Sequence, residues 1–160
     1  MIGRIRLLKQ LLLAFSKLRV VFRSPASLFL RAWRYTGVAS VLKHDLPIGS
    51  QFDGKITVVG TGNIVIGQHC RFGNGVYLET KGSGSIVIGN NVRINQGTII
   101  AARGTIGIGD NVLIGEYVSI RDANHSVSST KPYRLSGHDV SGINISDNVW
   151  VGRGCALLKG

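Results

Sequence analysis

The chain has 160 residues, of which 44% are hydrophobic and 17% are charged, a balance that is typical of one globular domain and excludes disordered or collagen-like sequence. Glycine is unusually frequent at 22 residues, whereas the 2 cysteines are too few for a disulfide scaffold. The formal net charge of +11 is concentrated at one end, because residues 1–44 contain nine basic side chains and no acidic one.

Residues 1–45 are expected to form a basic, amphipathic helical segment. Apolar side chains within residues 5–18 share one helical arc, with basic side chains opposite. A second helix is predicted over about residues 25–36, because Ser24–Pro25 provides an N-terminal cap and Gly37 a stop. The segment therefore predicts peripheral contact with an anionic membrane, with packing on the β domain or on a neighbouring subunit as the alternative.

The same segment argues against a membrane-spanning protein, a secreted protein and a nucleic-acid-binding protein. Its longest apolar run, residues 11–15, is too short to cross a bilayer, and no signal-peptide cleavage site follows it. Aromatic residues stand among its arginines, but they form no nucleic-acid-binding motif, so we expect no nucleic-acid partner. With so few cysteines, a cytoplasmic location is expected, at most peripheral to the inner face of the cell membrane.

From residue 46 onward, an aliphatic residue recurs at every sixth position. This period is neither that of a helix nor that of a flat strand. Three hexads make an 18-residue coil with three flat faces, and stacked coils bury one aliphatic column between parallel strands. The sequence therefore predicts an all-β parallel β-helix over residues 46–160. Successive coils align Ile66, Ile88, Ile108 and Ile145; Phe72, Ile94, Ile114 and Val151; and Leu78, Ile100, Ile120 and Leu157.

Extra residues interrupt the hexads at three places. Four stand near 81–84, two near Arg103 and 19 between Arg121 and Gly142. Solenoid insertions leave the frame at corners, so segment 121–142 is predicted to project as a loop, and a loop of this length on a rigid frame is more often functional than idle. A weaker coil is predicted from Leu46 to Asn63, with Ile48–Gly49 opening it.

These hexads resemble those of the hexapeptide-repeat acyltransferases, which fold as a left-handed parallel β-helix. DNVLIG, a loop that contains AsnHis, and then DNVWVG are similar to the galactoside, maltose and polysaccharide O-acetyltransferase branch. The resemblance implies acetyl-CoA as donor, a sugar or polysaccharide precursor as acceptor, no metal, and a homotrimer with active sites between subunits. O- or N-acylation and the acyl chain length stay open.

The resemblance places the catalytic histidine at His125, directly after Asn124. An alcohol is a poor nucleophile at neutral pH, and an imidazole with a pKa of about 6.5 can accept its proton as the carbon–oxygen bond forms. A surface histidine without chemistry is the alternative. His44, His69 and His138 match no family position, so we assign them no role.

Asn95 is the candidate acceptor-binding residue, because related enzymes carry a sugar-binding asparagine at the matching hexad. Its amide can both donate and accept a hydrogen bond. The alternative is a corner residue in a left-handed backbone conformation, and we assign four other asparagines to that role: Asn90, Asn91, Asn111 and Asn148.

The segment after the loop is the candidate acetyl-CoA site. Trp150, Gly152, Arg153 and Gly154 match the family segment that lies against the pantetheine arm. Glycines permit close approach of that arm, and the main-chain N–H of Arg153 is a candidate donor to the oxyanion of the tetrahedral intermediate. The tryptophan is alternatively only hydrophobic cover.

Other interpretations remain beside the enzyme. The main one is a catalytically inactive scaffold or binding protein, because relatives continue past the final LysGly with a further coil and a C-terminal truncation is expected here. A γ-class carbonic anhydrase shares the fold, but its zinc histidines include a closely spaced pair, whereas His125 and His138 are 13 residues apart. Cys70 and Cys155 are predicted to fill the core on different faces without a disulfide.

Overall fold

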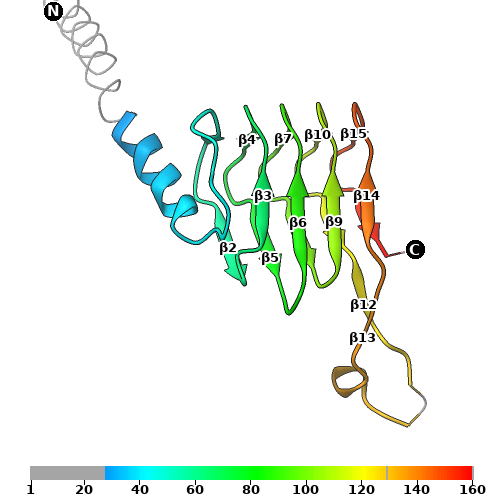
Figure 1. The fold of residues 1–160 in the computed structure, drawn as a ribbon. Coiled ribbons are helices and arrows are strands. Elements are labelled where there is room, and N and C mark those ends of the chain that lie inside the picture. The colour runs from blue at the N-terminus through cyan, green and yellow to red at the C-terminus, as the bar shows by residue number, and fades with distance from the viewer. Residues whose placement is uncertain (1–27, 129, 160) are drawn as a thin grey trace, which may run out of the picture. The chain divides into compact units, whose positions relative to one another are not determined.

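The computed structural model describes residues 28–128 and 130–159 (Figure 1). The chain divides into two compact units, Met1–Trp33 and Arg34–Gly160. The helix predicted within residues 5–18 lies outside the described residues. No helix in the described part of the chain is both long and apolar enough to cross a membrane.

A helix covers residues 28–39 of the described chain and continues through Gly37, where the sequence predicted its end. Tertiary contacts explain the extension. Val38 is buried in the core, and the Tyr35 hydroxyl donates a hydrogen bond to the carbonyl oxygen of Leu46. Arg34 Nη1 donates to the carbonyl oxygen of Asp53 at 3.0 Å. Such contacts outweigh the weak intrinsic preference of glycine against helix.

Three parallel sheets form the faces of a solenoid. Sheet A contains β1 (Gln51–Phe52), β4 (Arg71–Phe72), β7 (Arg93–Ile94), β10 (Leu113–Ile114) and β15 (Trp150–Val151). Sheet B contains β2 (Thr57–Gly60), β5 (Tyr77–Thr80), β8 (Ile99–Ala102), β11 (Ser119–Arg121) and β16 (Ala156–Leu158). Sheet C contains β3 (Ile64–Ile66), β6 (Ser85–Ile88), β9 (Thr105–Ile108) and β14 (Ile143–Ile145).

The strand register confirms the hexad alignment read from the sequence. Ile88 pairs with Ile66 and Ile108, and Ile108 pairs with Ile145. Ile114 pairs with Ile94 and Val151 in the same way. All of these side chains are buried, so each coil supplies one layer of a continuous aliphatic core.

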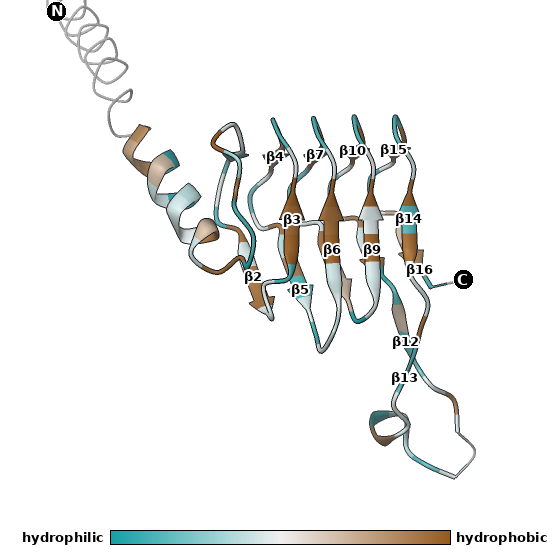
Figure 2. Cartoon of the chain, viewed as in Figure 1, coloured by the Kyte–Doolittle hydropathy of each residue, from teal (hydrophilic) through white to brown (hydrophobic). Residues whose placement is uncertain are grey.

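The solenoid is left-handed, as predicted. In Figure 1 the coils advance from β3 to β14 while the chain rises along sheet C in front, crosses the upper corner and returns behind it. Figure 2 shows apolar residues along β3 and β6 and hydrophilic residues at the upper corners. The fold is therefore a parallel β-solenoid of the hexapeptide-repeat kind.

The first coil is present but opens differently from the prediction. Its strands β1 and β2 pair with β4 and β5, which confirms a coil before residue 64. Leu46 is buried at 7% exposure, whereas Ile48 is 92% exposed. Leu46 therefore supplies the inward side chain, and the prediction that Ile48–Gly49 opens the coil is wrong, because Ile48 lies in a turn outside the strand pattern.

The corner between sheets C and A uses a left-handed residue in successive coils. His69, Asn91, Asn111 and Asn148 have φ between 56° and 60°. Asparagine adopts this conformation readily, so the corner role predicted for these three asparagines is confirmed. Asn90 has no positive φ and instead accepts a hydrogen bond from the Gln68 amide at 2.8 Å.

The two cysteines have different environments. Cys70 fills the core, as predicted, and burial raises the pKa of its thiol. Cys155 is exposed, so its prediction as a core residue is wrong. Both thiols are free.

The long insertion projects from the corner between sheets B and C, as predicted. Strands β12 (Ala123–His125) and β13 (His138–Val140) form an antiparallel hairpin, and a 3-10 turn, η1 (Tyr133–Leu135), lies in the loop beyond them. Figure 1 shows the hairpin extending away from the three sheets.

Candidate functional site

The hairpin places two histidine rings next to each other. His125 on β12 is the register partner of His138 on β13. Their ring centroids lie 4.4 Å apart with an angle of 38° between the ring planes. His138, to which the sequence analysis assigned no role, therefore belongs to the surroundings of His125. A separation of 13 residues gives no signal of this pairing, which depends on where the hairpin turns.

A buried aspartate fixes the root of this hairpin. Asp122 is 0% exposed, and its two carboxylate oxygens accept hydrogen bonds from the backbone amides of Arg103 and Gly104, both at 2.8 Å. The Ser141 amide donates to the Asp122 carbonyl oxygen at 2.9 Å. The aspartate thus joins the insertion at 103–104 to both ends of the loop. Sequence reasoning missed it, although an acidic residue two positions after the inward Ile120, on the same face of the strand, was a usable signal.

A cavity of about 390 Å³ opens between the hairpin and the outer surface of sheet B. Ala101 and Ala102 of β8 line it, and the small outward side chain of Ala101 leaves the space above it unfilled. Ala123, Asn124 and His125 contribute from β12. The cavity has a volume within the usual range for small-molecule sites.

Charged side chains surround this cavity. Glu79 and Lys81 line it and form an ion pair at 2.5 Å. The hydrogen bond from Lys81 holds the pKa of Glu79 below its ordinary value, and the Tyr77 hydroxyl acts in the same direction. Arg103, Arg121 and His138 complete the lining. The site is therefore cationic, with its carboxylate already paired.

The surroundings of His138 favour its neutral form, because they lower the pKa of its imidazole. Loss of hydration lowers its pKa most, followed by the charges of Arg103, His125 and Lys81. A neutral imidazole places no full positive charge beside His125.

The other candidate residues lie elsewhere on the chain. Asn95 follows β7 at the corner between sheets A and B, and its Oδ1 accepts a hydrogen bond from Arg93 Nε at 3.2 Å. It does not line the cavity beside His125. Its φ is not positive, so the alternative of a left-handed corner residue does not account for it.

The segment after the loop reaches the same corner as Asn95. Trp150 is 75% exposed on β15, and Gly152, Arg153 and Gly154 form the turn after that strand. The Arg153 guanidinium lies 5.6 Å from the centre of the Tyr117 ring. Sheet B separates this corner from the hairpin, so one chain holds the candidate residues as two sets.

The described residues include no group of three or more histidine, cysteine or acidic side chains arranged to hold a metal ion. Comparisons with known protein families, curated proteins and solved structures give no match for this chain. The residues at the hairpin and those at the corner between sheets A and B are therefore the basis for proposing a function.

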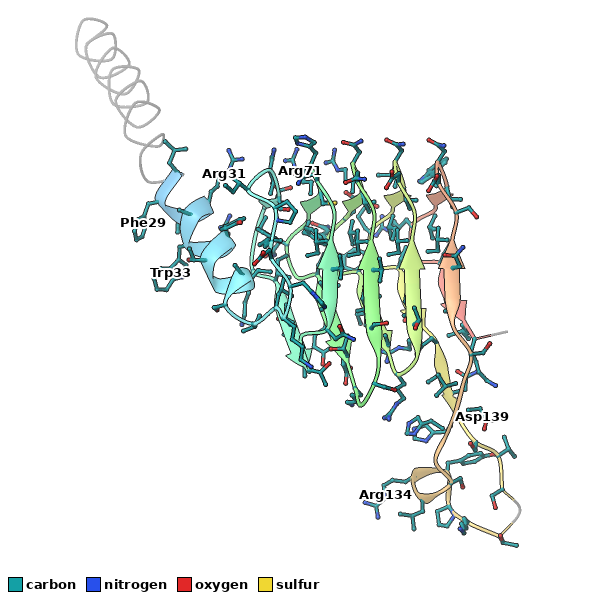
Figure 3. All side chains as sticks on the ribbon, viewed as in Figure 1. Phe29, Arg31, Trp33, Arg71, Arg134 and Asp139 are labelled. Carbon is teal, nitrogen blue, oxygen red and sulfur yellow. The ribbon has the colours of Figure 1, made fainter. Side chains whose placement is uncertain are left out.

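Beside the loss of hydration, the charge on Arg103 is expected to lower the pKa of His138. We predict that Arg103→Gln raises the pKa of His138 toward its ordinary value, because it removes a positive charge that opposes the imidazolium. The backbone bonds from residue 103 to Asp122 are kept. Titration of the imidazole signals by NMR measures the shift. Arg134→Gln, on the outer loop (Figure 3), is the charge-matched control, and an unchanged pKa in Arg103→Gln would contradict the prediction.

Proposed function

We propose that this protein is an acetyltransferase that moves an acetyl group from acetyl-CoA to a hydroxyl of a sugar or polysaccharide precursor. The single observation that carries the proposal is the position of His125, an imidazole that lines a cavity on a rigid hexad solenoid. This frame and this loop are the two features on which the resemblance to the hexapeptide-repeat acyltransferases depends.

His125 is the general base of the proposed reaction. It accepts the proton of the acceptor hydroxyl while the hydroxyl oxygen forms a bond to the thioester carbonyl carbon. The carbon–sulfur bond then breaks, the proton passes to the leaving thiolate, and the products are the acetyl ester and free coenzyme A. The His138 ring lies 4.4 Å away, and its lowered pKa favours a neutral neighbour for the base.

The separation of the two residue sets supports a homotrimer with shared active sites. In this arrangement the hairpin of one subunit meets the corner of the next. Asn95 then binds the acceptor, while Trp150, Gly152 and Gly154 contact acetyl-CoA. The Arg153 N–H is the proposed donor to the oxyanion. Such a head-to-tail interface closes into a ring.

We predict that His125→Asn lowers acetyl transfer by about 10²- to 10⁴-fold, which is the usual contribution of a general base. Release of coenzyme A thiol in the presence of a panel of sugar acceptors measures the rate. His69→Asn is the matched control, because His69 is an exposed corner residue with φ 57°, a conformation that asparagine accepts. Full turnover in His125→Asn would reject the assignment. No turnover in the natural chain with any acceptor would favour the inactive scaffold.

Shared active sites predict complementation between two impaired variants. His125→Asn and Asn95→Ala chains, when coexpressed, form mixed trimers in which about one third of the sites contain both natural residues. We expect activity above that of either variant alone, measured after purification of the mixed trimer by two different affinity tags. Trimers without any restored activity would show that the two residues do not share a site.

The described start of the helix supports the proposed peripheral membrane contact at the inner face of the cell membrane. Leu28, Phe29 and Trp33 are 61%, 67% and 69% exposed, and the Phe29 and Trp33 rings stack 6.4 Å apart (Figure 3). Aromatic rings of this kind insert at the headgroup boundary, and the basic residues of segment 1–44 attract an anionic leaflet with about 1 kcal/mol each.

We predict that the full chain floats with vesicles that contain anionic lipid and not with neutral vesicles. Phe29→Ser/Trp33→Ser is expected to lower the vesicle-bound fraction severalfold, because burial of each ring contributes about 1.5–3 kcal/mol. Val87→Ser, on the exposed side of sheet C, is the control for surface hydrophobicity. Equal flotation of both variants would assign the exposed rings to a subunit contact.

A further inference from the structure

The cavity beside His125 contains more positive than negative charge. Lys81, Arg103 and Arg121 line it, and Glu79 is the carboxylate in its lining. Because Glu79 is paired with Lys81, the two arginines have no carboxylate partner in an ion pair within the described chain. Two guanidinium groups at one cavity are therefore available to an anion.

The packing of sheet B holds these cations around open space. Glu79, Ala101 and Arg121 lie in register on β5, β8 and β11, so the small alanine separates the acid from the arginine. Arg121 Nε donates to Ser119 Oγ at 3.3 Å, which orients the guanidinium. The backbone of Arg103 is fixed by Asp122 at 2.8 Å. Both side chains thus start from rigid positions beside the hollow.

We propose that this cavity binds an anionic group of the acceptor, a carboxylate or a phosphate ester, and that the acceptor is an acidic sugar or a sugar phosphate. The planar guanidinium fork matches both groups. The inference rests on the proposed function, because it places the anion in the same cavity as the general base His125. Coenzyme A also carries phosphates, and in the proposed trimer its expected segment, Gly152–Gly154, meets the hairpin of the next subunit, so coenzyme A binding is measured beside the sugars.

The test is an NMR titration of the full chain with three probes: D-glucuronate, D-glucose 1-phosphate and neutral D-glucose. We expect at least one anionic probe to bind about tenfold or more tightly than glucose, and to shift the signals of the His125 and His138 rings. Arg121→Gln and Arg103→Gln are each expected to weaken that binding by about tenfold or more. Arg134→Gln, which removes the same charge from the outer loop, is expected to leave it unchanged.

Equal binding of glucose and both anions, or no binding of any probe, would overturn the proposal. A loss of coenzyme A affinity in Arg121→Gln that matches the loss for the sugars would also overturn it, because the cations would then serve the donor. Binding needs no turnover, so it is separable from the proposed function. His125→Asn is expected to keep the preference for the anionic probe, whether or not the chain transfers acetyl groups.

Discussion

The in-register stacking of one aliphatic side chain per hexad is the constraint on which the whole structure depends. A single coil cannot bury its own apolar residues, so each coil is stable only against its neighbours. The pairing of Ile94 with Ile114, and of Ile114 with Val151, shows that this stacking tolerates insertions of very different length. The insertions are expelled to the corners because any residue added within a strand would turn every later side chain to the wrong face.

The expelled loop is positioned by one buried charge. Asp122 occupies the position after the last pairing residue of β11, where the corresponding position of β8 holds Ala102. A buried carboxylate is costly unless its oxygens are satisfied, and here two backbone amides satisfy them. The same hydrogen bonds close the corner at 103–104. The frame thereby determines where the hairpin of His125 and His138 begins.

The chemistry of the cavity follows from small side chains beside charged ones. The small side chain of Ala101 on β8 leaves the hollow, while Lys81, Arg103 and Arg121 surround it with positive charge. Loss of hydration lowers the pKa of His138 most, and the nearby positive charges lower it further. The same positive charge favours an anionic ligand, as the proposed transfer to an acidic acceptor requires.

The sequence alone determined the solenoid, the inward residue of each later coil and the site where the long loop leaves the frame. A period of six has few structural solutions, and local glycine and asparagine positions mark the corners. Only tertiary structure decided the contact of His125 with His138, the anchoring role of Asp122 and the continuation of the helix past Gly37. Each of these depends on contacts between residues distant in the chain. The regular hexad period reveals which residues stack in successive coils. Contacts that lie outside this period leave no such pattern in the sequence.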